Sequence, residues 1–146
     1  MTKKTLSKNK GFTLVELIVV LVILAILAAI LVPTLLGYID KARSEKDFAT
    51  AQAVRVATQA QIDELYGKGD NTVEKNDITA DVKKEIFKLV GADTNNKIDG
   101  QEIGIADITI TNNQITDITV KIGDKYYKYV SSTNTWAAST APTTTP

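Results

Sequence analysis

Hydrophobic positions are concentrated in one block near the N-terminus, and the rest of the chain is polar. Between Lys10 and Asp40 the only charged residue is Glu16, and all 16 residues from Leu17 to Val32 are apolar. A bilayer core of about 30 Å is crossed by roughly 20 helical residues. The pattern therefore predicts that residues 12–39 form a membrane-spanning helix, with the preceding lysines on the cytoplasmic side.

Residues 40–66 are more polar and predict an amphipathic continuation of this helix, which would then reach about 80 Å from Phe12 to Tyr66. A face of mostly large side chains predicts packing against a folded domain. An alanine-rich face indicates either close approach of another helix or simply high helix propensity. The first face comprises Phe48, Ala51, Val54, Ile62, Leu65 and Tyr66, and the second comprises Ala42, Ala49, Ala53, Val56, Ala57 and Ala60.

Residues 67–132 have the pattern of a small domain that contains a helix and several strands. Breaker residues from Gly67 end the long helix, and a short amphipathic helix is predicted from Thr79 to Val90 with Gly91 as its stop. Strand-like alternation follows, with turn residues between the strands. The fold class is therefore α+β, a long helix packed on an antiparallel meander of three or four strands. The strands are predicted at 108–111, 118–122 and 126–130, with turns at Asn112-Asn113 and Gly123-Asp124.

Two further segments invite a functional interpretation. Residues 133–146 are rich in Thr, Ser, Ala and Pro and predict a flexible tail, either without a role or carrying O-linked sugars. Residues 93–100 have the composition of a calcium loop, but Lys97 stands at a ligand position of the EF-hand template and Ile98 replaces its glycine. A polar turn is therefore the better interpretation of this second segment.

Composition disfavours several classes of function. The 146 residues include no His and no Cys, so the usual imidazole base, thiol nucleophile, zinc ligands and disulfides are missing. The formal net charge is zero, but Lys3, Lys4, Lys8 and Lys10 all precede the apolar block. The residues after them are net acidic, which disfavours nucleic-acid binding. We therefore expect that the chain is not an enzyme and that it has no cofactor and no metal site.

The carboxylate of Glu16 is unusual because a charged group costs about 2.5–3.5 kcal/mol at a bilayer centre. The side chain either reaches the interface and is solvated, or it pairs with a positive group. Cleavage after Gly11 would create such a group, the α-amino group of Phe12, one helical turn before Glu16. A secretory signal peptide has a shorter apolar core and would not carry this carboxylate.

The segment from Lys8 to Glu16, followed by the apolar run and Pro33, closely resembles the N-terminal signature of the type IV pilin family, which includes the pseudopilins. The resemblance implies a leader peptide, residues 1–11, that a prepilin peptidase removes by cleavage between Gly11 and Phe12. It also implies methylation of the new amine of Phe12. Glu16 matches the residue that pairs with the N-terminal amine of a neighbouring subunit during assembly.

Pro33 matches the helix-breaking proline of the family, and its effect also follows from chemistry. Proline leaves the carbonyl of Ala29 without its helical donor and costs roughly 3 kcal/mol in a straight helix interior. Because Gly37 follows closely, we expect a kink or a local melt at Pro33 and Gly37, where the helix would leave the membrane.

The resemblance implies a structural subunit of a type IV pilus, made as a membrane precursor and polymerised through its N-terminal helices into a cell-surface filament. Its partners would be other copies of itself, the prepilin peptidase, the pilus assembly platform and minor pilins. The lack of cysteine makes a Gram-positive pilin more plausible by resemblance. The alternatives are a pseudopilin of a type II secretion or competence system and a single-span anchored binding module. Roles in adhesion, twitching motility or DNA uptake stay open.

Overall fold

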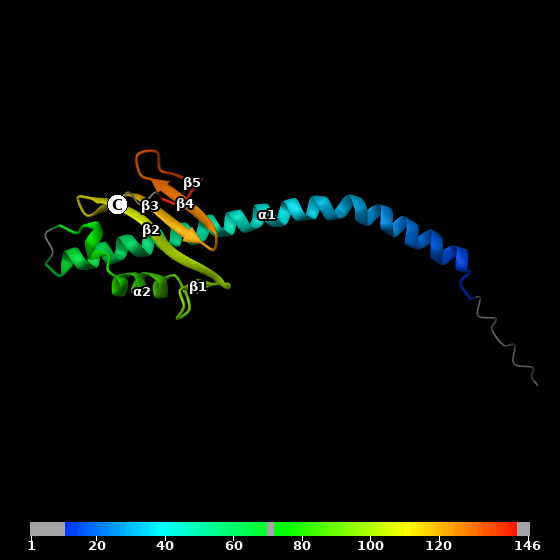
Figure 1. Ribbon diagram of the computed structural model, residues 1–146, viewed down its shortest axis with the longest axis horizontal. Helices are drawn as coiled ribbons and strands as arrows, with labels where there is room; N and C mark the ends of the chain where they lie inside the picture. The colour runs from blue at the N-terminus through cyan, green and yellow to red at the C-terminus, as the bar shows by residue number, and fades with distance from the viewer. Residues whose placement is uncertain (1–10, 70–71, 143–146) are drawn as a thin grey trace, which may run out of the picture. The chain divides into compact units, whose positions relative to one another are not determined.

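The computed structural model describes residues 11–69 and 72–142, and these fall in two compact units, Met1–Ala42 and Arg43–Pro146 (Figure 1). Helix α1, Leu14–Gly67, contributes to both units. The predicted long helix is therefore present, beginning two residues later and ending one residue later than expected. The predicted leader falls mostly on residues 1–10, which lie outside the described residues.

In the N-terminal unit, no described side chain is buried. The large apolar side chains from Leu14 to Ile39 expose between 46% and 74% of their surface. This cylinder of apolar groups has no covering within its own unit, which is the expected state of a helix whose partner is lipid or another chain.

Helix α1 continues through Pro33 and Gly37, so the helix is not melted there in this structure. Proline removes one hydrogen bond, while the turns on either side keep theirs. The hydroxyl of Thr34 donates to the carbonyl of Leu31 at 2.8 Å, but this is not the Ala29 carbonyl that the proline leaves without its helical donor. Opening of the helix at this point within a filament stays a prediction.

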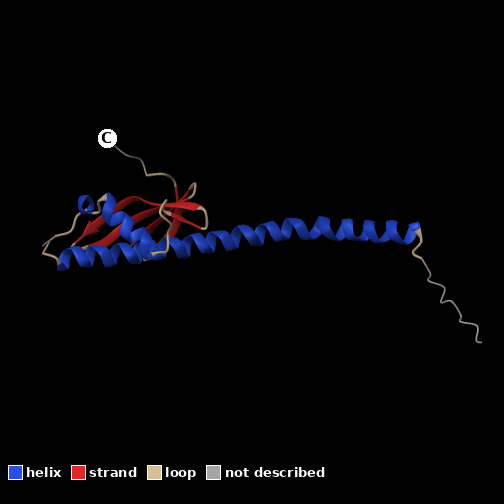
Figure 2. Ribbon diagram, turned by 90° about the horizontal axis from the view of Figure 1, so that it is seen from below, coloured by secondary structure: helices blue, strands red, loops and turns tan. Residues whose placement is uncertain are grey.

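The C-terminal unit is an antiparallel five-stranded meander that packs on the part of α1 belonging to this unit (Figure 2). Between α1 and the sheet in sequence lie a 3-10 turn, η1, and helix α2, whose N-cap is Thr79. The α+β fold class is confirmed. The elements are η1 (Lys75–Asp77), α2 (Ala80–Leu89), β1 (Lys97–Ile98), β2 (Gln101–Thr111), β3 (Gln114–Ile122), β4 (Lys125–Val130) and β5 (Thr135–Ser139), and the strand order is β1-β2-β3-β4-β5.

The predicted turns are present where the backbone needs a left-handed conformation. Asn112 and Asn113 have φ values of 53° and 60° between β2 and β3, and Gly123 has φ 58° between β3 and β4. Residues 93–100 contain a turn on each side of β1, and in the first of them the carboxylate of Asp93 accepts hydrogen bonds from the backbone N–H groups of Asn95 and Lys97.

The core forms between the large-residue face of α1 and the inner face of the sheet. Ala51, Val54 and Ile62 are buried, and Phe48 and Leu65 are packed against them, as expected. Two expectations are wrong: Tyr66 is 54% exposed, although the pattern places it on the face of large side chains, and Ala57 is buried, although the pattern places it on the alanine-rich face.

Strand β5 corrects the prediction of a flexible tail over 133–146. Residues 135–139 pair in regular register with β4. The indole Nε1 of Trp136 donates to Oε1 of Gln52 at 2.8 Å, and its ring lies 5.4 Å from that of Tyr129. This strand has five residues and only one large apolar side chain, so its sequence shows no alternation of polar and apolar positions. Its stability comes from the contacts of Trp136. Residues 143–146 lie outside the described residues.

Candidate processing and assembly site

The predicted cleavage site lies immediately before α1. Phe12 is 88% exposed, and Gly11 and Phe12 precede the first helical residue, Leu14. A Cβ atom added to Gly11 would meet no atom within 4 Å, and φ of Gly11 is not in the left-handed region. The structure of the chain itself therefore gives no reason for glycine at this position.

Glu16 and Thr13 form a reciprocal capping arrangement at the start of α1. The backbone N–H of Thr13 donates to Oε2 of Glu16 at 2.8 Å, and the Thr13 hydroxyl lies 3.0 Å from the same oxygen. The backbone N–H of Glu16 in turn lies 3.2 Å from Oγ1 of Thr13. A Thr three residues before a Glu is the sequence signature of this capping box. Sequence reasoning missed Thr13, although the signal is present in Thr13-Leu14-Val15-Glu16.

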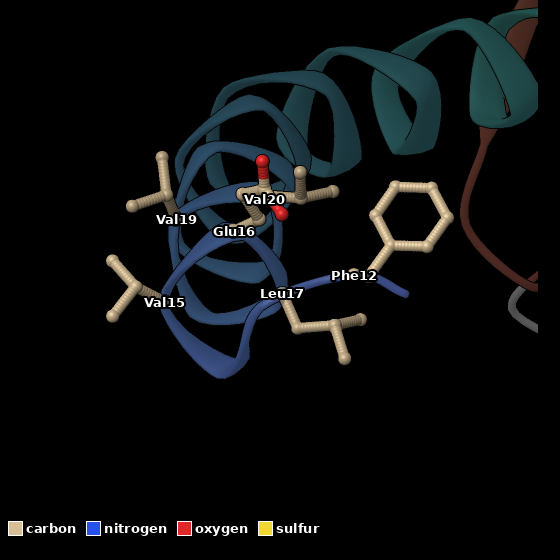
Figure 3. A pocket seen from close by; sticks show the side chains of 6 residues that line it. All are labelled: Phe12, Val15, Glu16, Leu17, Val19 and Val20. Atoms are coloured by element: carbon tan, nitrogen blue, oxygen red, sulfur yellow. The ribbon is translucent and has the colours of Figure 1, made fainter. Parts of the chain in front are cut away.

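The carboxylate lies in an apolar setting on one side of the helix. A shallow hollow on the helix surface is lined by Phe12 and by the side chains around Glu16, and Figure 3 shows that the carboxylate is the one polar group among the six labelled side chains. The hollow is formed by one helix and has no second wall. Both hydrogen bonds from Thr13 go to Oε2, and no described residue donates a hydrogen bond to the other oxygen of the carboxylate.

The structure brings together only some of the predicted residues. Gly11, Phe12 and Glu16 gather at the start of α1, whereas Pro33 and Gly37 lie further along the same helix. At 1.5 Å per residue, Pro33 is about 25 Å from Glu16. Any role of Pro33 and Gly37 therefore belongs to the flexibility of the helix and not to the cleavage site.

Helix α1 is long and apolar enough to cross a membrane, with a mean hydropathy of 3.3 over its most apolar 18-residue window. The conclusion that α1 could cross a membrane rests on its length and composition.

The C-terminal unit contains one buried charged contact that sequence reasoning also missed. Asp47 is 5% exposed, and its Oδ2 accepts a hydrogen bond of 2.7 Å from the hydroxyl of Tyr127. Nζ of Lys125 lies 3.9 Å from the same oxygen. Burial raises the pKa of Tyr127 to about 12, and the Asp47 carboxylate contributes. An acidic residue in a polar helix is normally solvated, so no pattern marks this one as buried.

The fold and the N-terminal site together define a precursor with an apolar helix and a helix-and-sheet domain. The prokaryotic N-terminal methylation motif matches residues 6–32. Residues 6–32 therefore match the class III signal peptide that type IV pilins carry, and this match supports a type IV pilin-like or pseudopilin precursor. This motif belongs to structural proteins of the pilin type and not to enzymes. No curated protein and no solved structure matches the chain.

Proposed function

We propose that the chain is the structural subunit of a type IV pilus. A prepilin peptidase cleaves between Gly11 and Phe12 and methylates Phe12, and the mature chain polymerises through α1 into a cell-surface filament. Other copies of the chain, the assembly platform and minor pilins are its partners. The observation that carries the proposal is the exposed apolar segment of α1 from Leu14 to Ile39, which carries a single carboxylate, Glu16, within the methylation motif.

The exposed surface of α1 supports polymerisation. From Leu14 to Ile39 the apolar side chains have no partner in their own unit, and a bilayer satisfies them only while the chain is a precursor. Outside the bilayer, similar helices from other copies provide the same apolar environment, because burial of apolar surface is favourable and non-directional. Release from the membrane therefore requires assembly.

A second exposed stripe lies on the part of α1 that belongs to the C-terminal unit. Ala49, Ala53, Val56 and Ala60 lie three or four residues apart on α1 and are all exposed. Val56, the largest of them, is 55% exposed. Small side chains at this spacing allow the backbones of two helices to approach closely. The alanine-rich face fits packing against α1 of another copy.

Glu16 supports the proposal through the carboxylate oxygen to which Thr13 does not donate. Thr13 satisfies Oε2 in the precursor, and a new amine on Phe12 of a neighbouring subunit is a donor that the other oxygen can accept. A carboxylate buried among apolar helices is destabilising alone, whereas pairing with an amine neutralises it and selects one axial stagger. The pairing between subunits follows from the pilin-like motif; the spacing within one helix also allows Glu16 to reach its own amine.

The test separates processing from assembly. Glu16→Gln keeps the shape of the side chain and removes its charge, so the variant should insert and be cleaved normally but give little filament. Thr13→Ala is the matched control, since it removes the Thr13 hydroxyl and its two hydrogen bonds but keeps the Glu16 carboxylate and the bond from the backbone N–H of residue 13, so it should assemble far better than Glu16→Gln. Processed chain in membranes is measured against chain in sheared filaments. Wild-type filament yield from Glu16→Gln would overturn the assembly role.

The chain recovered from membranes and from sheared filaments also distinguishes the proposal from its alternatives. A processed chain with a methylated Phe12 and no long surface filament would favour a pseudopilin. An intact Met1 on the membrane protein would favour a single-span anchored binding module. Mass measurement of the N-terminal peptide decides between these outcomes.

A further inference from the structure

Strand β5 is an open edge of the sheet. In the part of the chain that the structure describes, β5 pairs with β4 on one side and with no strand on the other. The outward backbone N–H and C=O groups of an edge strand are a template for another strand. Every residue of β5 is exposed or half-buried. The hydrogen bond between Trp136 and Gln52 holds the strand on the unit, so the edge is both accessible and fixed.

The opposite edge of the sheet is protected, and β5 is not. Proteins protect sheet edges with charged side chains, bulges, prolines or covering segments. The other edge strand is β1, which has only two residues, and beyond it β2 is irregular between Ile105 and Asp107, where Nζ of Lys75 in η1 lies 2.6 Å from Oδ1 of Asp107. Strand β5 pairs without a bulge, and it contains no proline. The sequence from Ser131 to the C-terminus contains no charged residue.

We propose that the outer edge of β5 pairs antiparallel with β5 of a second copy of this chain about a two-fold axis at Ala137. In this register Thr135 lies opposite Ser139 of the other copy, and Trp136 lies opposite Ala138. A large side chain then meets a small one, and no charge is desolvated. The same surface is used by both copies, which is the usual geometry of a two-fold contact.

The symmetry determines which copies can pair. A two-fold axis perpendicular to the sheet reverses the direction of each strand and of the part of α1 packed on it. The two copies therefore run in opposite directions. If the chain forms the filament proposed above, in which all subunits share one direction, the contact joins two filaments; this consequence rests on the proposed function, and the strand pairing itself does not.

A single contact of this kind is weak. Five residues provide an edge of about 17 Å, whereas stable interfaces bury about 1,200–2,000 Å². Isolated chains should therefore pair only at high concentration. Contacts that repeat along two filaments act together, and their combined affinity exceeds that of one pair by orders of magnitude.

The first test uses the absence of cysteine from the chain. Ala137→Cys in the full-length protein in detergent should give a disulfide-linked dimer on mild oxidation, because residues directly opposite have Cβ atoms about 4.5–5.5 Å apart. Leu89→Cys is the matched control, at a position of α2 that is 60% exposed. Thr135→Cys alone should cross-link poorly, since its partner is Ser139.

The cross-linking result decides the proposal whether or not filaments form. We expect several-fold more dimer from Ala137→Cys than from either comparison variant. Equal cross-linking of Ala137→Cys and Leu89→Cys would overturn the contact, and strong cross-linking of Thr135→Cys would overturn the antiparallel register. Failure of the filament proposal leaves this readout intact, because the sample is the detergent-solubilised chain.

A second test measures the contact between filaments. Ala137→Lys adds a charge to the edge, and Leu89→Lys adds the same charge elsewhere. Bundled filaments sediment at low speed and single filaments do not. Wild-type and Leu89→Lys filaments should sediment several-fold more than Ala137→Lys filaments. Sedimentation of Ala137→Lys equal to wild type would contradict the proposal.

Discussion

The contact between Tyr127 and Asp47 gives the sharpest test of the packing in the C-terminal unit. All the buried residues that the structure describes lie in Arg43–Pro146, so we expect a fragment of these residues to fold alone. Tyr127→Phe in this fragment removes the hydroxyl that donates to the buried carboxylate of Asp47. The ring stays in place and keeps its edge contact with Phe48, at 4.8 Å between centroids.

The magnitude follows from the hydrogen bond that is lost. A hydrogen bond to a charged group contributes about 1.5–3 kcal/mol. After the substitution, Asp47 keeps Lys125 at 3.9 Å, which is too long for a hydrogen bond. We expect the free energy of unfolding at pH 7 to fall by about 1.5–3 kcal/mol. The midpoint of thermal unfolding should fall by about 4 °C or more for each kcal/mol.

The pH dependence gives a second, independent readout. The pKa of Tyr127 is raised to about 12 in the folded state, against about 10 for an unfolded tyrosine. Between these values the unfolded chain loses the proton and the folded chain keeps it, so the stabilising contribution is complete below pH 10 and is lost as pH rises toward 12. Over this range the wild type should lose about 2–3 kcal/mol that the Tyr127→Phe variant does not lose.

Urea unfolding of both proteins at several pH values measures the difference. The gap between wild type and Tyr127→Phe should close as pH rises from 9 to 12. Tyr126→Phe is the matched control, because Tyr126 is half-buried and faces away from Asp47 on the same strand. A gap that is absent at pH 7, or that stays constant up to pH 12, would refute the assigned contact.

Four further outcomes are expected. Ile118→Ala should lower the free energy of unfolding of the fragment by about 2–5 kcal/mol in urea titration, because Ile118 is fully buried. Lys75→Met should raise the pKa of Asp107, which its hydrogen bond to Lys75 holds below the usual range, as followed by NMR titration. The wild type has a stabilising contribution above the ordinary carboxyl pKa that is lost as pH falls through the lower folded pKa, and the variant should lack this contribution. Gly11→Val should block cleavage without changing the fold, as read from the N-terminal mass, since its Cβ meets no atom. The fragment 43–146 should be soluble, with a mixed helix and strand spectrum by circular dichroism.

The sequence by itself determined the elements whose signal is local and periodic. An uncharged apolar run predicts the first half of α1 because length and hydropathy alone decide whether a helix suits a bilayer. The turns at Asn112-Asn113 and at Gly123 were visible because few residues tolerate the left-handed conformation there. The residues around Gly11 and Glu16 form a local motif, so their likeness to the pilin signature could be recognised without knowledge of the fold.

Tertiary structure decided the features that depend on distant partners. Asp47 is buried because Tyr127, 80 residues later in the chain, donates to it, and no local pattern encodes that pairing. Strand β5 exists because Trp136 packs against Tyr129 and bonds to Gln52, although its own residues have no strand period. The exposure of the alanines of α1 was also not visible in the helical pattern, since Ala57 is buried while Ala53 and Ala60 are exposed.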